Sequence, residues 1–302
     1  MKIAVVSNSC EVHARNIVDV CNKILNPKFE FTLMPYDGMY DSGWELVDFS
    51  QYDVLLNIGY FVPVATFLES VRRAEPELKV VNVWVGSDIL QNVGHASAGM
   101  TQHRDAALNY INLADCDKFV GELDALLDIE ARAVKTCPKD MPEVTPMPEE
   151  PRILVYLPGH RAAFYNVELL LEVASMAVDT TFTFVGVDPS HAPTLPNVRW
   201  LSMLSREAWL AEIQRSTGSL RCPQHDGVSV STLETLAAGR YVVTNQPGIP
   251  NTIYADKVVD VYLAVRQIAA LKEPNVAGAA WVRDNYSPEA MAESYRVVLD
   301  GL

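Results

Sequence analysis

The stretch from Cys222 to Tyr254 constrains the fold of this chain more than any other. It holds a glycine-bearing turn at 226–227, apolar residues at helical spacing up to Gly239, and the apolar, β-branched run YVVT at 241–244. This order predicts a loop, a short helix with a C′ glycine, and a buried strand. A loop that opens onto a helix N-terminus leaves backbone N–H groups unpaired. The stretch therefore predicts a site for a phosphate or diphosphate.

The two acidic residues of this stretch allow two interpretations. Ser231 stands three residues before Glu234, which is the spacing of a capping box, in which Glu234 only reaches back to the helix start. That spacing alone favours helix capping over ligand binding, because capping boxes are common. Asp226 lies eight residues before Glu234, and this longer spacing favours a ligand site when it is taken with the residues that follow.

The longer pattern is Asp-x7-Glu, then LAAGRYVVT, then Gly-Ile-Pro at 248–250. It resembles the nucleotide-sugar signature of retaining glycosyltransferases with the GT-B fold, especially family 4. That family shows Glu-x7-Glu, a small-residue helix ending in glycine, a Val-Val strand and a Gly-Gly-Ile-Pro-Glu loop. Here Asp226 stands for the first Glu, Pro247 for one glycine and Asn251 for the last Glu. A match over roughly thirty residues is far more specific than a lone short motif.

The resemblance implies an α/β fold of two Rossmann-like domains facing a cleft, with a C-terminal helix that packs back on the N-terminal domain. The sequence supports a division, since residues 136–151 contain five prolines and no periodicity, which predicts a linker. The expected parts are an acceptor-side domain, a proline-rich linker, a nucleotide-sugar-binding domain and a terminal helix, over residues 1–136, 137–151, 152–286 and 287–302.

Hydrophobic periodicity predicts alternating strands and helices in both halves. In the first half, strands are expected at 2–8, 29–35, 52–59, 80–88 (with its loop) and 117–122, and helices at 12–25, 62–74, 101–113 and 123–134. In the second half, strands are expected at 152–159, 182–188, 198–204 and 241–244, and helices at 160–174, 205–215, 262–271 and 287–302, with 258–261 as a separate segment. Ser205 and Ser287 are the expected N-caps of two of these helices.

The resemblance implies a donor site around Arg161, Asp226 and Glu234. Arg161 would grip the diphosphate, since arginine suits bidentate phosphate contacts, although the usual downstream lysine is missing. Glu234 would accept hydrogen bonds from the ribose, and Asp226 would lie near the sugar hydroxyls. These three are the expected catalytic residues. The further donor-binding residues are Gly159, Gly186, Gly227, Val228, Ser229, Ser231 and Thr232.

The acceptor side is expected at the carboxyl ends of the first strands, where open parallel sheets bind ligands. The piece WVGSDIL at 84–90 resembles the family, whose members often have a histidine where this chain has Val85, so that contact is absent or comes from His95 or His103. The expected residues on this side are His13, Arg15, Gly86, Ser87, Asp88 and His95. Helix capping explains Ser87 and Asp88 equally well, and His13 and Arg15 can also be solvated first-turn residues. Loops 37–44 and 91–104 are expected to choose the acceptor.

Composition narrows the partners. The net charge of −14 disfavours binding to nucleic acid or an anionic membrane surface, and no basic amphipathic helix appears. The expected acceptor is therefore a soluble small molecule, glycan or protein. No apolar run approaches the ~20 residues that span a bilayer, and the N-terminus lacks a signal-peptide pattern, so a cytoplasmic protein without membrane insertion is expected. Five widely spaced cysteines indicate free thiols.

The resemblance thus implies a glycosyltransferase that moves a sugar from a nucleotide-sugar to an acceptor, with retention. The nucleotide-sugar is a co-substrate, and neither a cofactor nor a metal is expected, since the histidines form no cluster in the sequence. The first turn lacks G-x-G-x-x-G, which argues against a dehydrogenase. Two alternatives stay open. One is a non-hydrolysing sugar-nucleotide epimerase. The other is a non-catalytic sugar-nucleotide-binding protein, which the departures at Val85, Asp226 and Asn251 and the missing lysine favour. The sequence does not indicate the sugar, the nucleobase or the oligomeric state.

Overall fold

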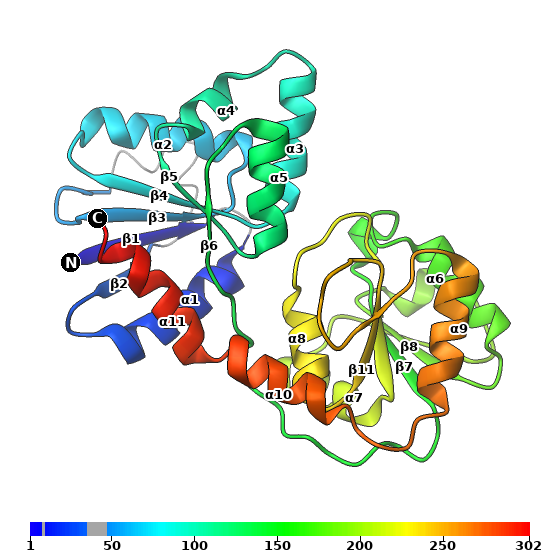
Figure 1. Cartoon of the computed structure of the whole chain (residues 1–302). Helices are drawn as coiled ribbons and strands as arrows, with labels where there is room; N and C mark the ends of the chain where they lie inside the picture. Colours follow the sequence, from blue (N-terminus) through cyan, green and yellow to red (C-terminus); the bar gives the residue numbers. More distant parts are fainter. Residues whose placement is uncertain (8–9, 35–46) are drawn as a thin grey trace. The chain divides into compact units, whose positions relative to one another are not determined.

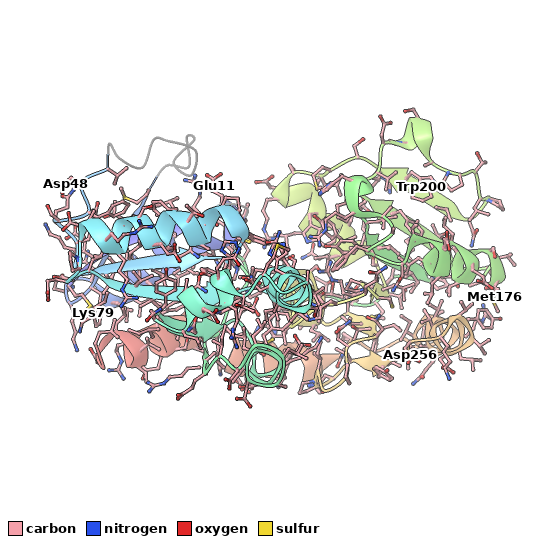
Figure 2. All side chains as sticks on the ribbon, turned by 90° about the horizontal axis from the view of Figure 1, so that it is seen from above. Glu11, Asp48, Lys79, Met176, Trp200 and Asp256 are labelled. Carbon is pink, nitrogen blue, oxygen red and sulfur yellow. The ribbon has the colours of Figure 1, made fainter. Side chains whose placement is uncertain are left out.

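The computed structural model describes residues 1–7, 10–34 and 47–302 and forms two compact units. The first unit comprises Met1–Thr136 and Pro288–Leu302, and the second comprises Cys137–Ser287. Each unit contains one six-stranded sheet whose strands are all parallel, with helices packed on it (Figure 1). The prediction of an α/β chain with two Rossmann-like domains is confirmed. Charged side chains such as Lys79 in the first unit and Asp256 in the second lie on the surface (Figure 2).

The first unit has the strand order β2-β1-β3-β4-β5-β6, so the direction of winding reverses between β1 and β3. Helix α11 packs against α1, α2 against α4, and α3 against α5. The strands are β1 (Lys2–Ser7), β2 (Glu30–Leu33), β3 (Val54–Ile58), β4 (Lys79–Trp84), β5 (Ile111–Ala114) and β6 (Arg132–Ala133). The helices are α1 (Glu11–Leu25), α2 (Val62–Ala74), α3 (Ser87–Ser97), α4 (Gln102–Ala107), α5 (Asp117–Leu127) and α11 (Pro288–Leu299).

The second unit has the order β12-β11-β10-β7-β8-β9, which is the strand order of the dinucleotide-binding Rossmann fold. Its winding reverses between β7 and β10. The strands are β7 (Arg152–Tyr156), β8 (Thr181–Val185), β9 (Val198–Leu201), β10 (Gly218–Arg221), β11 (Tyr241–Thr244) and β12 (Ile253–Tyr254). The helices are α6 (Val167–Met176), α7 (Arg206–Arg215), α8 (Val230–Ala237), α9 (Val258–Ala269) and α10 (Val276–Asn285), with short 3₁₀ turns η2 (Gly159–Arg161) and η3 (Pro189–His191).

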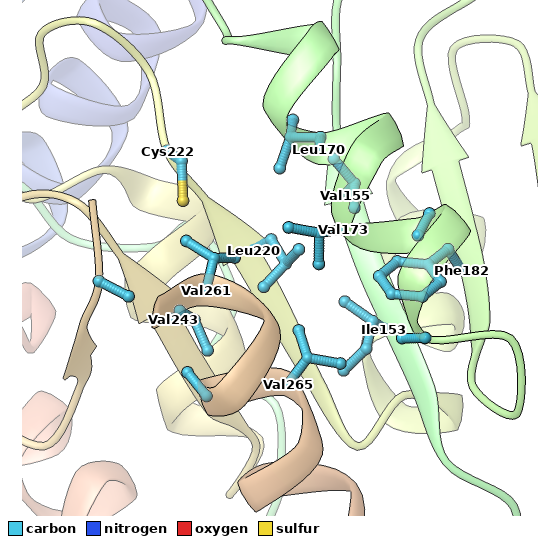
Figure 3. Close-up of a cluster of buried hydrophobic side chains, with 14 of the residues drawn as sticks. Ile153, Val155, Leu170, Val173, Phe182, Leu220, Cys222, Val243, Val261 and Val265 are labelled. Carbon is cyan, nitrogen blue, oxygen red and sulfur yellow. The ribbon is translucent and has the colours of Figure 1, made fainter. Parts of the chain in front are cut away.

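The second sheet is buried on both faces, which is why its strands are continuously apolar. On one face, side chains such as Ile153 and Val155 of β7 pack against α6 and α9, and Figure 3 shows Leu170, Val173 and Val261 closing over them. On the other face, Leu154 of β7 packs with residues of α7, and the next cluster joins α8 to α10. Alternate residues of one strand thus belong to different cores.

Three predicted elements between residues 101 and 134 are wrong, including the helix expected over 123–134, which ends as part of α5 at Leu127 and is followed by β6 at Arg132–Ala133. The helix expected over 101–113 ends as α4 at Ala107, and β5 follows. The strand expected over 117–122 is the first part of α5. Phe119, Leu123 and Leu127 recur every four residues and are all buried, so the period of 3.6 residues decides this segment.

The second half also differs from the prediction, and strands β10 and β12 were not predicted. The helix expected over 160–174 begins only at Val167, because a 3₁₀ turn and a bend precede it. The segment 258–261 is the first turn of α9, and α10 was not predicted. Ser205 is the N-cap of α7, as predicted, and its Oγ accepts a hydrogen bond from the Ala208 amide at 3.3 Å.

The proline-rich segment 137–151 is part of the second unit. We call it the proline strap. Arg206 binds Asp140 (Nε–Oδ2 3.0 Å), Arg283 donates to the carbonyl of Pro142 at 2.8 Å, and Arg240 donates to the carbonyl of Thr145 at 2.8 Å. The boundary between the units is therefore the Thr136–Cys137 junction, not a fifteen-residue linker. No helix among residues 1–7, 10–34 and 47–302 is long and apolar enough to cross a membrane.

Candidate functional site

The candidate site lies at the carboxyl edge of the second sheet, where β7 and β10 are neighbours and the winding reverses. Open α/β sheets bind ligands outside the carboxyl ends of strands at such a point. The loops that follow the two strands are joined. The Gln224 amide donates to the carbonyl of Phe164 (2.8 Å), and Asn166 Nδ2 donates to the carbonyl of Cys222 (2.8 Å). Arg161 belongs to the first loop and Asp226 to the second, so the fold brings them to the same edge.

Helix α8 begins at this edge. Its N-cap is Ser229, whose Oγ accepts a hydrogen bond from the Thr232 amide at 3.3 Å. The capping box expected between Ser231 and Glu234 is therefore wrong, because the helix starts earlier and Glu234 points away from its start. The amides of Val230 and Ser231 are also in the first turn and have no intrahelical acceptor. Together with the helix dipole, they provide donors for an anion.

The remaining donor-side residues of this stretch lie around the helix start. Thr232 is buried, and its Oγ1 accepts a hydrogen bond from Ser229 Oγ at 2.9 Å. Ser231 Oγ lies 3.2 Å from the same Ser229 hydroxyl. Gly227 is buried, and half-buried Val228 packs with the α8–α10 cluster. Ser229 and Ser231 are thus the hydroxyl-bearing residues at the helix start that stay partly exposed.

Glu234 is buried within the second unit and does not face an open site. Its side chain is 2% exposed, Oε1 accepts from Arg206 Nη1 at 2.5 Å, and Oε2 accepts from Trp209 Nε1 at 2.7 Å. Burial raises the pKa of Glu234, and the Arg206 guanidinium opposes that rise. Arg206 in turn holds Asp140 of the proline strap. In this conformation Glu234 joins α7 to α8, and a ribose cannot reach its carboxylate.

Asp226 forms an ion pair that the sequence did not indicate. Its Oδ2 accepts from Arg221 Nε at 2.7 Å, and Oδ1 accepts from the Gly227 amide at 3.2 Å. Burial would lower the pKa of the Arg221 guanidinium, but the Asp226 carboxylate beside it raises that pKa above its ordinary value. Both acidic residues of the Asp-x7-Glu pattern thus have an arginine of the same unit as partner.

Arg161 is the contrasting cation of this site. It ends the 3₁₀ turn after β7, it is half-buried, and its guanidinium carbon lies 4.3 Å from the centre of the Phe164 ring. Among the residues that the structure describes, no carboxylate lies within ion-pair distance of Arg161. A guanidinium at a sheet edge with only an aromatic neighbour keeps its N–H groups for an outside acceptor.

The turn that carries Arg161 is built on a close backbone approach. Gly186 follows β8 with φ of +107°, and a Cβ there would lie 2.9 Å from the carbonyl oxygen of Leu157. Its own carbonyl accepts from the Gly159 amide at 2.9 Å. A side chain at Gly186 would clash with this backbone, so glycine is required at the position. The hydrogen bond from the Gly159 amide to the Gly186 carbonyl then holds the turn that carries Arg161. Gly159 is exposed beside it.

Asn251, which stands where the resembled family has Glu, suits the backbone conformation of its position. Asn251 has φ of +60°, a left-handed conformation that asparagine tolerates better than most residues with a side chain. Its carbonyl accepts from Asn275 Nδ2 at 3.2 Å, at the start of α10. Asn251 is exposed at the end of the loop that follows β11.

In the first unit, Asp88 is a structural residue. It is fully buried, and its carboxylate accepts backbone N–H groups of Tyr60 (2.8 Å), Val85 (3.1 Å) and Ile89 (3.0 Å). Burial raises the pKa of Asp88, and these N–H groups oppose the rise. Asp88 therefore ties the loop after β3 to the loop after β4, and it cannot contact an acceptor in this conformation. Of the two interpretations of Asp88, the structure supports the local, helix-start one.

The neighbours of Asp88 are differently placed. Gly86 is buried at the N-cap of α3, and Ser87 is half-buried in its first turn. His95 lies on α3 with its ring centre 6.2 Å from that of His103, and its Nδ1 is buried without a hydrogen-bond partner among the described residues. Ser87 and His95 remain candidates for acceptor contacts. The loop 37–44 lies outside the described residues.

The two candidates on α1 differ in environment. Arg15 is exposed and pairs with Glu11 at 2.6 Å, the residue labelled at the start of α1 in Figure 2. An exposed i,i+4 pair of this kind is an ordinary surface contact. His13 is half-buried, its Nδ1 lies 3.4 Å from Thr136 Oγ1, and desolvation lowers its pKa to about 4. His13 is therefore neutral at pH 7.

Sequence reasoning missed the residues that surround the two carboxylates. Arg221, Tyr156, Tyr165 and Trp209 form one connected group with them, through ring contacts of 5.9 Å between Tyr156 and both Tyr165 and Trp209. The available signal was a charged residue, Arg221, at the end of an otherwise uncharged and buried strand. A buried strand that ends in arginine at a sheet's carboxyl edge is worth singling out.

No protein-family model matches this sequence, and no curated protein matches it. Solved structures do match. Sucrose-phosphate synthase from Thermosynechococcus elongatus aligns over 100% of both chains with a TM-score of 0.77 and 10% identity. An alpha,alpha-trehalose-phosphate synthase (UDP-forming) from Burkholderia vietnamiensis aligns over 100% of both chains with a TM-score of 0.68 and 9% identity. S. aureus TarM, solved with UDP, has a TM-score of 0.65 and 10% identity.

The fold is that of the GT-B glycosyltransferases. The match to TarM covers 85% of this chain and 57% of TarM, so this chain spans little more than half of that protein. At these identities the likeness establishes the GT-B fold alone. Activity is argued from the site.

Proposed function

We propose that this protein is a glycosyltransferase that binds a nucleoside-diphosphate sugar at the carboxyl edge of the second sheet and transfers the sugar to an acceptor. The observation that carries the proposal is Arg161. It is a cation without a carboxylate partner in the described part of the chain, on the loop next to the one that leads into the α8 N-terminus. A guanidinium and a helix start on neighbouring loops are complementary to a diphosphate.

The proposed chemistry is electrostatic. As the bond between sugar and diphosphate breaks, negative charge develops on the leaving phosphate. Arg161 and the amides of Val230 and Ser231 would stabilise that charge, and donors fixed in advance need no reorganisation at the moment of reaction. This arrangement neutralises the phosphates without a metal, so we propose a metal-independent reaction. Retention at the anomeric carbon follows from the resemblance and is part of the same proposal.

Glu234 has a narrower role than the resemblance implies. Glu234 would reach the ribose only if Arg206 or Trp209 releases it, because both carboxylate oxygens are engaged and the side chain is 2% exposed.

The acceptor would bind at the carboxyl edge of the first sheet, beside Ser87 and His95. The acceptor proposed is a soluble small molecule, glycan or protein.

The test is ligand-induced stabilisation. The purified protein is melted with UDP, GDP, ADP, TDP and their common sugar conjugates, because a ligand that binds only the native state raises the melting temperature. One nucleotide should give a clear shift, and Arg161→Gln should remove it. Arg215→Gln is the matched control, since Arg215 is 61% exposed and pairs only with Glu212 on the same helix. The absence of any shift across the panel would refute the donor site.

Turnover separates the transferase from its alternatives. A transferase consumes the stabilising nucleotide-sugar faster when an acceptor is added, and product analysis gives the anomeric configuration. An epimerase converts the donor with no acceptor present. Tight nucleotide binding with neither reaction would assign a binding protein.

A further inference from the structure

The ion pair between Arg221 and Asp226 occupies the point where the winding of the second sheet reverses. Arg221 is the last residue of β10, and its neighbour Leu220 is in register with Val155 of β7. The two side chains are 12% and 18% exposed. An ion pair this deeply buried contributes little net stability, because the cost of desolvation offsets the attraction. Its position at the sheet edge therefore points to a function.

Arg221 and Arg161 contact the same group of aromatic rings. The Arg221 guanidinium carbon lies 4.9 Å from the centre of the Tyr165 ring, and that of Arg161 lies 4.3 Å from the Phe164 ring. The Phe164 and Tyr165 rings are 5.5 Å apart. The hydrogen bond from the Gln224 amide to the Phe164 carbonyl holds the two loops together. One arginine from the loop after β7 and one from the end of neighbouring β10 thus reach one edge.

The pKa of the Tyr156 hydroxyl is affected by both arginines. Burial raises its pKa, the Tyr165 hydroxyl raises it further, and both Arg221 and Arg161 lower it. Two cations from different loops therefore act on a single group at the end of β7. The positive potential of this edge comes from both arginines, with the half-charge of the α8 N-terminus beside them.

The hydrogen bond to Asp226 leaves Arg221 suited to a second acceptor. Asp226 accepts from Nε, on the side of the guanidinium, at 2.7 Å. A guanidinium has five N–H donors in a rigid plane, so the Asp226 carboxylate on Nε and a hydrogen bond with the Tyr165 side chain orient the plane and still leave N–H groups for a further acceptor. Tyr165 stacks on its face and restricts it further. Phosphate binding by arginine is strongest when the plane is held in advance in this way.

A diphosphate has two ionised phosphoryl groups, so a second guanidinium beside Arg161 and the α8 N-terminus would strengthen its binding. Building on the function proposed above, we infer that Arg221 is the second phosphate-binding cation of the donor site and that Asp226 is its positioning residue. This assigns Asp226 a role different from contact with the sugar hydroxyls. It also explains why an arginine ends β10, where the strand is otherwise buried.

The test uses inorganic pyrophosphate, which presents the phosphates without sugar or base. Its affinity for the full chain is measured by calorimetry. Arg221→Gln should weaken binding about tenfold or more, which is the usual effect of losing one hydrogen bond to a charged group. Asp226→Asn should weaken it as well, and the double variant should lose no more than Arg221→Gln alone. Arg215→Gln should bind as the wild type does.

These results separate positioning from sugar contact and from a structural role. If Asp226 contacts only the sugar, Asp226→Asn leaves pyrophosphate affinity unchanged, and its role as a positioning residue is overturned. If the pair is only structural, both variants lower the unfolding midpoint while affinity at 10 °C stays at the wild-type value, which overturns the inference. If Arg221→Gln fails to fold, Arg221→Lys keeps the charge and should bind between the wild type and Asp226→Asn; wild-type affinity would refute the role of Arg221.

The outcome for the wild type distinguishes this inference from the proposed function. Wild-type protein that binds pyrophosphate, and loses it in Arg161→Gln but not in Arg221→Gln, keeps the donor site and refutes the second cation. Wild-type protein that binds neither pyrophosphate nor any nucleoside diphosphate refutes both.

Discussion

At the scale of single residues, this chain uses buried arginines as connectors. Arg221 is 12% exposed, Arg240 is fully buried and Arg206 is half-buried, and Arg206 and Arg240 bond segments far apart in the sequence. Arg240 is fully buried and donates to the carbonyls of Thr145, Pro146 and Gln214. Burial lowers the pKa of Arg240, and none of its bonds in the described residues is to a carboxylate. Neutral acceptors compensate this cation, namely backbone carbonyls together with the Thr145 hydroxyl and the Met147 sulfur.

Replacement of Arg240 by methionine should destabilise the protein by about 3 kcal/mol, since the carbonyls of Thr145, Pro146 and Gln214 all lose a donor. The midpoint and slope of urea denaturation measure the change. Arg215→Met in the same unit, at a 61% exposed position, should change stability by less than about 0.5 kcal/mol. Equal stability of the two variants would show that the carbonyls find other partners.

At the scale of elements, the start of α8 links stability to ligand binding. Ser229 caps the helix through the Thr232 amide, and the next two amides face the proposed phosphate. The sequence predicted this helix, its C′ glycine and the following strand. Gly239 has φ of +73°, and a Cβ there would lie 2.8 Å from Val144 of the proline strap. Both the backbone conformation and the lack of space therefore require glycine at this position. The capping residue was mispredicted by two positions, because Ser229 and Ser231 are equally good candidates locally.

Ser229→Ala should cost about 1 kcal/mol of stability through loss of the cap, and it should weaken nucleotide binding by loosening the first turn. Ser231→Ala is the matched control, because Ser231 Oγ bonds no backbone amide of the helix start and should change stability little. Thermal denaturation with and without the stabilising nucleotide gives both quantities. A larger loss in Ser231→Ala would mean that the helix begins two residues later than observed.

At the scale of the whole molecule, the chain folds into two domains. The segment that separates them is shorter than the proline-rich composition of residues 137–151 indicates. The proline strap reads as a linker because it is rich in proline and lacks periodicity. Arg206, Arg240 and Arg283 nevertheless bind it to the second unit. Motion between the units is therefore expected at the Thr136–Cys137 and Ser287–Pro288 junctions.

A fragment of residues 137–287 should fold alone and bind the same nucleotide as the full chain. A fragment of residues 152–287 lacks the strap partners of those three arginines, although each keeps one partner within the fragment, and it should be destabilised by several kcal/mol or fail to fold, because donors lose their acceptors. Circular dichroism and the thermal-shift panel compare the two. Equal stability of both fragments would contradict the strap as part of the domain.

The sequence by itself determined the α/β class, the two halves, most strands and the helix at 230–237 with its C′ glycine, because these follow from local periodicity and turn chemistry. It failed for residues 101–134, where a short strand and an interior glycine hide the helical period. Only the tertiary structure decided the partners of the polar groups. Arg221 meets Asp226, Arg206 meets Glu234 across 28 residues, and Arg240 meets Thr145 across 95. Such pairings depend on which strands and helices become neighbours, and no local pattern in the chain encodes that.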